Sequence, residues 1–143
     1  MNIQKKVNFF FEDIEQFEFN KEKYREWVVR IIKSEGSVPG FLNIVFVSDE
    51  YLLDLNKKHL SHDYYTDVIS FGYSFEEYDN IYGDIFISIE SIKENAKEYD
   101  ESFKNELLRV IAHGVLHLLG YDDKKPELKK VMQEKENIYI NSF

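Results

Sequence analysis

Two of the four histidines in this chain, His113 and His117, are four residues apart in a strongly apolar stretch. Residues so spaced lie on one face of a helix, with Cβ atoms roughly 5–6 Å apart, so both imidazoles can reach one metal ion. Gly120 can end this helix, and the turn after it can bring the carboxylate of Asp122 or of Asp123 to the same ion. Three protein ligands leave one position open for water, as in catalytic metal sites. The pattern therefore predicts a site for one divalent ion, zinc above all, that serves hydrolysis.

The histidine pair also has a plainer explanation, because the H-x-x-x-H spacing is short and paired histidines can simply be hydrogen-bonded core residues. The surrounding sequence favours the metal. Nearly all neighbours of the pair are apolar, namely Leu107, Leu108, Val110, Ile111, Val115, Leu116, Leu118 and Leu119. Such a helix is usually buried, and two buried imidazoles need polar partners, which a metal ion supplies.

Gly114 argues against a zinc peptidase. In those enzymes the first histidine of the pair is followed directly by the glutamate that acts as general base, and this chain has glycine there. Glycine within a helix costs up to about 1 kcal/mol relative to alanine. We therefore expect that something packs or passes close to Gly114, such as substrate or another stretch of backbone.

The rest of the chain predicts the elements that hold this segment in place. Apolar and aromatic runs predict strands at residues 3–11, 42–47, 66–71 and 82–89, with a loop or hairpin tip at 74–80. Helices are expected from Asn20 to the breakers Gly36, Pro39 and Gly40, after Ser48, over 92–99, from Asp100 or Ser102 to Gly120, and from Pro126 onward. This order indicates an α+β fold with a small mixed sheet, in a single domain over residues 1–143.

Composition limits the classes of function. The chain has no cysteine, which excludes disulfides and cysteine-based metal sites. No stretch approaches the roughly 20 apolar residues of a membrane span, and the apolar run after Lys6 is too short for a signal peptide, so we expect a cytoplasmic protein without a membrane partner. The formal net charge of −9 should repel nucleic acid on average. An RNA-binding face would need local lysines, and the candidates, which can equally be solvated helix-face residues, are Lys57, Lys58, Lys124, Lys125, Lys129 and Lys130.

Around the two histidines the sequence resembles the signature H-G-x-L-H-L-x-G-Y-D-H of the YbeY family, bacterial endoribonucleases of ribosomal RNA maturation. The matching residues are His113, Gly114, Leu116, His117, Leu118, Gly120, Tyr121 and Asp122, and Asp123 replaces the last histidine. Further family features are matched by Asn56, Asp63, Thr66 to Phe71, Gly83-Asp84-Ile85, Met132 and Glu136. The resemblance covers residues 40–140.

By this resemblance His113 and His117 are zinc ligands, and Asp123 has the place of the third ligand, which makes it preferable to Asp122. A carboxylate oxygen binds zinc at a distance similar to that of an imidazole nitrogen. The resemblance also implies one zinc ion per chain and a zincin-like metal-dependent hydrolase fold, with a four-stranded mixed sheet and about five helices.

The implied activity is metal-dependent endoribonuclease cleavage of single-strand-type RNA. It would act in late 3′-end maturation of small-subunit ribosomal RNA and in ribosome quality control, with ribosomal RNA, the small subunit and ribosomal or assembly proteins as partners. The alternative is a ribosome-associated assembly factor whose metal site is mainly structural, and the net acidity favours it. A third class is a hydrolase of another ester or amide.

The sequence departs from the family at Leu60, and it leaves the general base and the role of Asp84 undecided. Leu60 stands where the family usually has an arginine tied to RNA cleavage, so Lys57, Lys58, His59 or His62 would have to replace its charge. The sequence offers no obvious general base, and the role falls to water bound to the metal or to Asp122. Asp84 is either a residue that orients a ligand histidine or a cap at the start of a strand.

Overall fold

A mixed four-stranded sheet organises the part of the chain that the computed structural model describes, which is residues 6–60, 66–75 and 78–143. The strands are β1 (Val7–Phe11), β2 (Val38–Val47), β3 (Val68–Phe75) and β4 (Tyr78–Ser88), arranged in the order β1-β2-β4-β3. β2 pairs with β1 and β4 in parallel, and β3 pairs with β4 antiparallel. The predicted α+β class with a small mixed sheet is confirmed.

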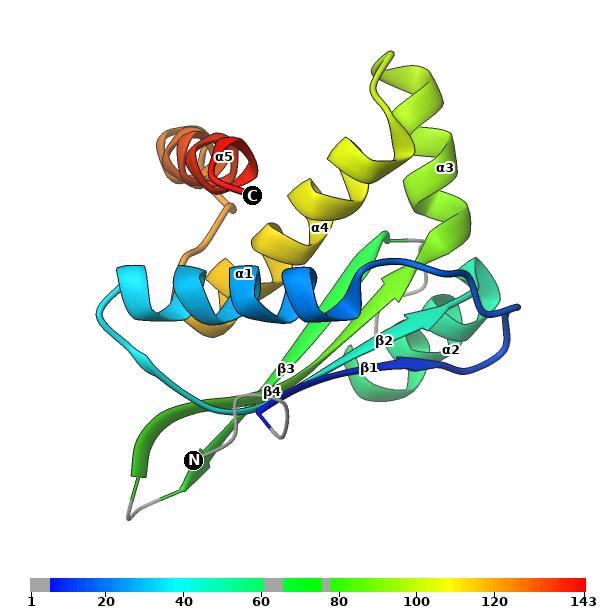
Figure 1. Cartoon of the computed structure of the whole chain (residues 1–143). Coiled ribbons are helices and arrows are strands. Elements are labelled where there is room, and N and C mark those ends of the chain that lie inside the picture. Colours follow the sequence, from blue (N-terminus) through cyan, green and yellow to red (C-terminus); the bar gives the residue numbers. More distant parts are fainter. Residues whose placement is uncertain (1–5, 61–65, 76–77) are drawn as a thin grey trace.

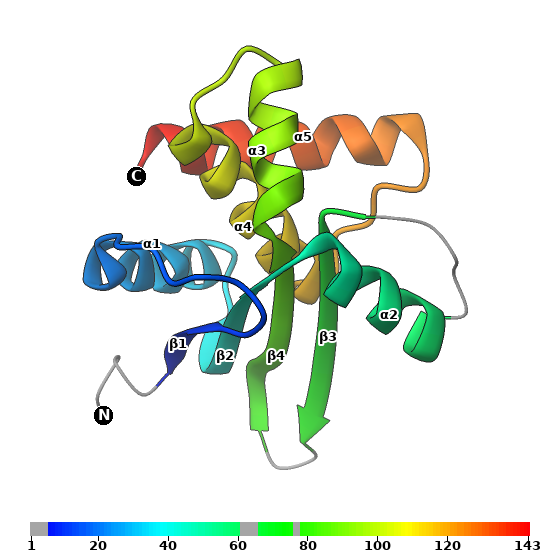
Figure 2. The same ribbon diagram turned by 90° about the vertical axis from the view of Figure 1, so that its right-hand side faces the viewer.

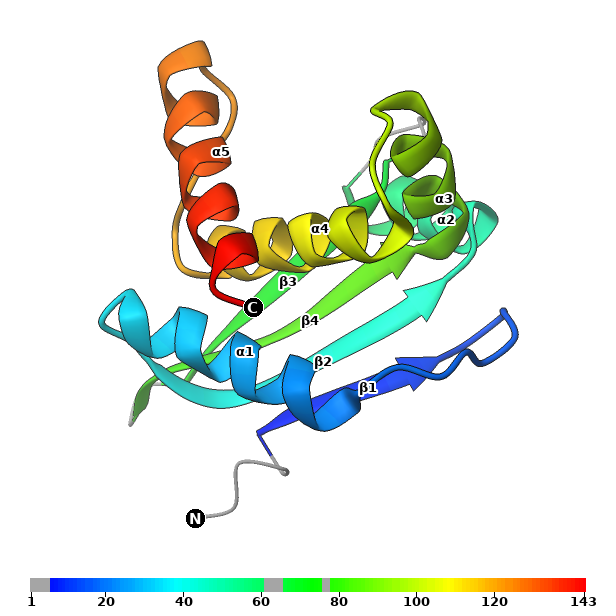
Figure 3. The ribbon, with the colours of Figure 1, turned by 45° about the horizontal axis from the view of Figure 1, so that its top comes forward.

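Five described helices surround this sheet, and not all of them contact it directly (Figure 1). They are α1 (Lys21–Ser34), α2 (Asp49–Leu60), α3 (Ile89–Glu98), α4 (Phe103–Leu118) and α5 (Pro126–Asn141). α1 and α4 lie over the same face of the sheet (Figure 3), and α5 packs on them from outside. The Trp27 indole N–H ties α1 to α5 by donating to the Tyr139 carbonyl at 2.8 Å.

The side chains of the central strands alternate between two apolar clusters, which is why β2 and β4 are almost continuously apolar. Ile44, Phe46, Ile85 and Ile87 face the cluster that contains α1 and α4, and all four are fully buried. Val45, Val47 and Phe86 face the other side and pack with α2 (Figure 2). Strands buried on both faces therefore separate α2 from α4.

Side-chain caps begin four of the helices, largely where the sequence predicts them. Asn20, Ser48, Ser88 and Ser102 each accept a hydrogen bond from a backbone N–H three residues later, at 3.0–3.1 Å. Ser102, and not Asp100, caps α4. Pro126 occupies the first turn of α5, as expected.

Several predicted boundaries are wrong. Pro39 and Gly40 lie inside β2 and not in the turn after α1, which ends at Ser34. They are tolerated there because the β2–β4 register shifts between Pro39 and Phe41.

Ile89 begins α3 instead of ending a strand, because Ser88 caps the helix at that point. β3 and β4 extend to Phe75 and from Tyr78, so the hairpin tip is shorter than predicted. Along the described residues no helix is long and apolar enough to cross a membrane.

Candidate metal centre

Helix α4 presents His113 and His117 on one face because they are four residues apart. Gly114 lets this helix approach the sheet closely: a Cβ built on it would lie 2.8 Å from Ile85 Cγ2 and 3.3 Å from Ser70 Oγ. The Ser70 hydroxyl also donates to the Gly114 carbonyl at 3.0 Å. Strand side chains, and neither substrate nor another backbone, thus account for the glycine in mid-helix.

The turn after α4 brings Asp123 back to the two histidines. Gly120 has φ +102°, a conformation that favours glycine, and the Tyr121 N–H donates to the Leu116 carbonyl at 3.0 Å. The chain then reverses beside the helix that it has just left. The predicted role of Gly120 as the turning point is confirmed.

Three side chains converge at the end of this turn. His113 Nε2 and His117 Nε2 are 3.0 Å apart, Asp123 Oδ2 is 3.4 Å from His113 Nε2, and Asp123 Oδ1 is 3.7 Å from His117 Nε2. Among the described residues these three form the group whose ligand atoms all lie within 4.8 Å of one another. Ligands at about 2.1 Å from a tetrahedral ion are about 3.4 Å apart, so the arrangement fits zinc.

The outer nitrogens of both imidazoles are already held. His113 Nδ1 lies 2.7 Å from Glu136 Oε2 on α5, and His117 Nδ1 lies 3.0 Å from the Tyr121 carbonyl. Because both partners are acceptors, each Nδ1 is the protonated nitrogen, which leaves the Nε2 atoms to face each other. Two facing lone pairs at 3.0 Å need a cation between them, either a proton or a metal ion.

The pKa values of the two rings shift in opposite directions. Burial pulls the pKa of His113 down, but the hydrogen bond and charge of Glu136, with the charges of Asp123 and Asp67, outweigh burial and raise it. Burial and the neighbouring charge of His113 lower the pKa of His117. Without metal, a proton on His113 Nε2 can therefore be donated to His117 Nε2. A metal ion would replace that proton.

An open pocket of about 460 Å³ surrounds the convergent atoms. The other side chains that line it include Thr66, Asp67, Ser70, Glu106, Arg109 and Glu136. The side chains of His113, His117 and Asp123 are 24%, 33% and 36% exposed, so the histidines are less buried than the apolar helix suggests. Small molecules and water can reach the site.

Two acidic side chains of this pocket are linked through one amide. The Asn95 Nδ2 group donates to Asp67 Oδ2 at 3.1 Å and to Glu106 Oε2 at 3.3 Å. Burial raises the pKa of Asp67 and that of Glu106. In both acids the effect of burial outweighs the hydrogen bond from Asn95, which favours the charged carboxylate.

Other predicted site residues lie apart from this group. Asp122 is exposed, and its Oδ1 accepts from the Lys124 N–H at 2.9 Å, so the structure groups only the neighbouring Asp123 with the histidines. The role of Asp122 as general base stays a prediction. Asp84 accepts from the Asn43 amide at 2.9 Å and from the Tyr73 hydroxyl at 2.7 Å. The partner of His113 is Glu136 instead of Asp84.

Three of the residues expected to replace the charge of the family arginine, Lys57, Lys58 and His59, are on α2, across the sheet from α4. His59 is exposed there, with its ring 5.8 Å from that of Phe71. The side chain of Leu60, and all of His62 and Asp63, lie outside the described residues. The candidate lysines fall into two groups, one on α2 and one that directly follows Asp123 and continues into α5; all six are exposed.

Sequence reasoning gave no role to Glu136 and Arg109. Glu136 is 3% exposed and lies one helical turn after the buried Met132, so a charged residue on the apolar face of α5 is the signal that could have revealed it. Arg109 lies one turn before His113, and the spacing of 109, 113 and 117 was visible in the sequence. The Tyr121 carbonyl left no signal, because any residue has one.

Known proteins resemble this chain over nearly its whole length. A family model described as "Endoribonuclease YbeY" matches residues 10–143. Curated proteins named "Endoribonuclease YbeY" include one from Flavobacterium psychrophilum, 45% identical over 89% of this chain and 90% of its own, and one from Cytophaga hutchinsonii, 44% identical over 97% of each. The solution structure of TM1509 from Thermotoga maritima is 30% identical, covers 94% of this chain and 87% of its own, and superposes with a TM-score of 0.63. These matches, found on a fold that agrees with theirs, show that the chain belongs to the YbeY family.

Proposed function

We propose that this protein is a zinc-dependent endoribonuclease whose ion is bound by His113, His117 and Asp123. The observation that carries the proposal is the convergence of their three ligand atoms in an open pocket. The names of the relatives, all described as endoribonucleases, support RNA as the substrate. The lysines that directly follow Asp123 support it too, because they put positive charge beside the site of an acidic protein.

When bound, zinc supplies a Lewis acid that polarises a phosphoryl oxygen and makes a coordinated water more acidic. The protein's own residues orient and open the site. Glu136 and the Tyr121 carbonyl fix the rotation and tautomer of the two imidazoles. The sheet side of the pocket, formed by Thr66 to Ser70, leaves space for a ligand beside the histidines.

We extend the proposal to late 3′-end maturation of small-subunit ribosomal RNA and to ribosome quality control in the cytoplasm. The partners would be ribosomal RNA and the small ribosomal subunit, together with ribosomal or assembly proteins. What supports this extension is the family resemblance of the metal-site motif, from His113 to Tyr121.

Cleavage of a single-stranded RNA and of a structured RNA by zinc-loaded protein tests the activity. We expect His113→Ala, and wild type treated with EDTA, to lose at least a hundredfold in rate, because the ion loses a ligand or is absent. Tyr99→Ala is the control, since Tyr99 is 61% exposed and does not line the pocket. Equal background cleavage by wild type and His113→Ala would exclude the nuclease.

The alternative is an assembly factor with a structural ion. The net charge of −9 favours it, as do the four acidic side chains that line the pocket. It predicts that His113→Ala lowers the melting temperature markedly even where no RNA is cleaved. It also predicts that wild type, though inactive on RNA, still recovers small-subunit particles in pull-downs.

A further inference from the structure

Arg109 belongs to the same face of α4 as the two candidate ligand histidines. It lies four residues before His113 and lines the same pocket. One helical turn separates the two residues, about 6 Å along the helix axis. The Arg109 side chain is 30% exposed, so the guanidinium is open to a ligand that enters beside the histidines.

Helix α5 holds the guanidinium in place. Arg109 Nη1 donates to Glu136 Oε1 at 3.2 Å, and Nη2 donates to Asn137 Oδ1 at 2.9 Å. The other oxygen of Glu136 binds His113 Nδ1 at 2.7 Å. One buried carboxylate therefore fixes both the guanidinium and the imidazole. A guanidinium has five N–H donors, so these two bonds leave donors for an anion.

The charge of the pocket makes Arg109 distinctive. Among the described residues that line it, Arg109 is the one arginine or lysine, and it lies beside four acids. Burial raises the pKa of two of those acids, Asp67 and Glu106. A phosphate group entering this pocket could meet a cation on each side: the metal ion and the guanidinium.

We propose that Arg109 and the metal ion form a two-point subsite for a phosphate group of the substrate. The inference rests on the proposed function, since it assigns the phosphodiester of RNA to this pocket. The guanidinium donates two N–H bonds to phosphate oxygens, in the planar forked geometry that arginine makes with phosphate. Glu136 holds the guanidinium of Arg109 and the imidazole of His113 in a fixed position relative to each other. The rival explanation is that Arg109 only neutralises Glu136 and joins α4 to α5.

Binding of inorganic phosphate to zinc-loaded protein, measured by calorimetry, tests the subsite without RNA. We expect Arg109→Gln to weaken phosphate binding at least tenfold, while zinc affinity stays within threefold of wild type. Arg109→Lys should lie between the two, because an ammonium keeps the charge but not the fork. Arg30→Gln is the matched control, since Arg30 also donates to the C-terminal segment, at the carbonyl of Ser142 directly after α5, but does not line the pocket.

RNA cleavage gives a second readout. Arg109→Gln should raise KM for RNA and reduce the salt dependence of RNA binding by about one phosphate contact, a change of roughly 0.7–0.9 in the slope of log affinity against log salt. If Arg109→Gln and Arg109→Lys both bind phosphate as tightly as wild type does, the subsite does not exist. If Arg109→Gln loses zinc together with phosphate, Arg109 acts only through Glu136 and the proposal is overturned. If phosphate binding falls as expected but wild type cleaves no RNA, the subsite stands and the nuclease fails.

Discussion

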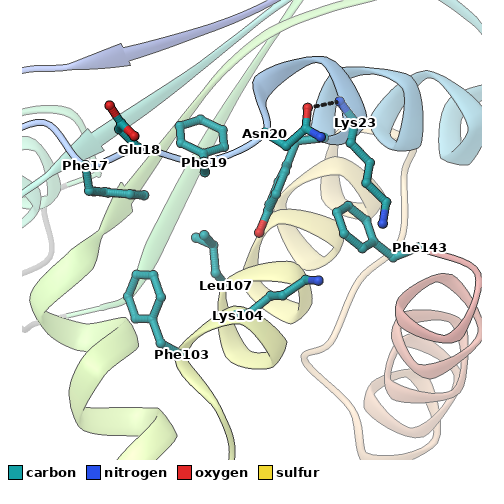
Figure 4. Close-up of a pocket in the computed structure, with 10 residues that line it drawn as sticks. Phe17, Glu18, Phe19, Asn20, Lys23, Phe103, Lys104, Leu107 and Phe143 are labelled. Carbon is teal, nitrogen blue, oxygen red and sulfur yellow. Dashed lines mark hydrogen bonds between the residues drawn. The ribbon is translucent and has the colours of Figure 1, made fainter.

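The two ends of helix α4 border cavities of similar size and opposite character. At the N-terminal end, Phe103 and Leu107 line a cavity of about 400 Å³ whose other walls include the rings of Phe17, Phe19, Tyr24 and Phe143 (Figure 4). The pocket of about 460 Å³ extends along α4 from Glu106 to the two histidines near its C-terminal end, and it is lined by these histidines, by acids and by Arg109. Cavity volume therefore does not distinguish a site from a packing defect. A site is distinguished by titratable side chains that converge on one point and are held by fixed hydrogen-bond partners.

The aromatic end stabilises the fold. The rings of Phe17 and Phe103 meet edge to face at 5.9 Å, and those of Tyr24 and Phe143 at 4.9 Å. Lys23 and Lys104 both place their ammonium groups over the Phe143 ring, at 4.5 and 5.0 Å from its centroid (Figure 4). Such pairs each contribute about 0.5–1.5 kcal/mol beyond burial. Substitutions at this end should change stability and leave metal affinity unchanged.

The side chains at the metal end favour ion binding over the stability of the metal-free fold. It keeps Glu136, which is 3% exposed, and holds His113 and His117 with their Nε2 atoms facing each other. Buried acids and facing imidazoles destabilise the metal-free fold unless protons or ions compensate. Substitutions at this end should change metal affinity and leave the stability of the metal-free protein nearly unchanged, or even raise it.

The largest expected effect is that of His117→Ala on zinc affinity. One of three ligands contributes about a third of the roughly 10–16 kcal/mol of a protein zinc site, so affinity should fall by roughly 200- to 6,000-fold. The unfolding free energy of the metal-free protein should change by less than about 1 kcal/mol, because the side chain is 33% exposed. Chelator competition and urea unfolding measure the two. A metal-free variant that unfolds far more easily would break the contrast between the ends.

Glu136→Gln should come next, with zinc affinity lowered about 10- to 100-fold. The amide can still accept from the His113 ring but no longer offers a negative charge to it or to Arg109. The same chelator competition measures the loss. Glu22→Gln is the control, because Glu22 pairs with an arginine on the exposed side of α1. An unchanged affinity in Glu136→Gln would mean that Glu136 does not orient the ligand.

Phe103→Ala probes the aromatic end and should lower the unfolding free energy by about 2 kcal/mol. Full truncation of a buried phenylalanine costs about 3–5 kcal/mol, and Phe103 is only half-buried. Zinc affinity should stay within twofold of wild type. Tyr99→Ala, at a residue that is 61% exposed, should change stability by less than about 0.5 kcal/mol. A clear loss of zinc affinity in Phe103→Ala would show that the two ends are coupled through α4.

The sequence predicted the metal end better than it predicted the way that end is held. The spacing of His113 and His117, and the glycine turn before Asp123, determine a local geometry, so their convergence could be expected from α4 and its turn alone. Glu136 comes from a helix that begins after Asp123, and its meeting with His113 depends on how α5 docks. Periodicity gives the face of a helix but not its partner.

The fold shows the same limit. Capping residues placed the start of α4 at one of two positions, Asp100 or Ser102, whereas the start of β2 was misjudged at Pro39 and Gly40. Those residues are turn formers by local preference, and a register shift in the sheet accommodates them inside a strand. Strand order could not be derived either, because the β1-β2-β4-β3 arrangement depends on pairing between distant segments.

Asp67→Asn should give the smallest effect, with a sign opposite to that of Phe103→Ala. The pKa of Asp67 is raised by burial, so its contribution to stability is present below the ordinary aspartate pKa of about 3.9 and is lost as pH rises through the folded-state pKa. Asparagine at position 67 keeps an oxygen that accepts from the Asn95 amide, and its stability does not fall as pH rises because it does not ionise. Metal-free Asp67→Asn should therefore be more stable than wild type at pH 7, by about 1 kcal/mol or less, and equal to it near pH 3.5. Urea unfolding at both pH values measures this difference. If the variant is less stable than wild type at pH 7, the attraction between the charges of Asp67 and His113 stabilises the fold more than the burial of the Asp67 charge destabilises it.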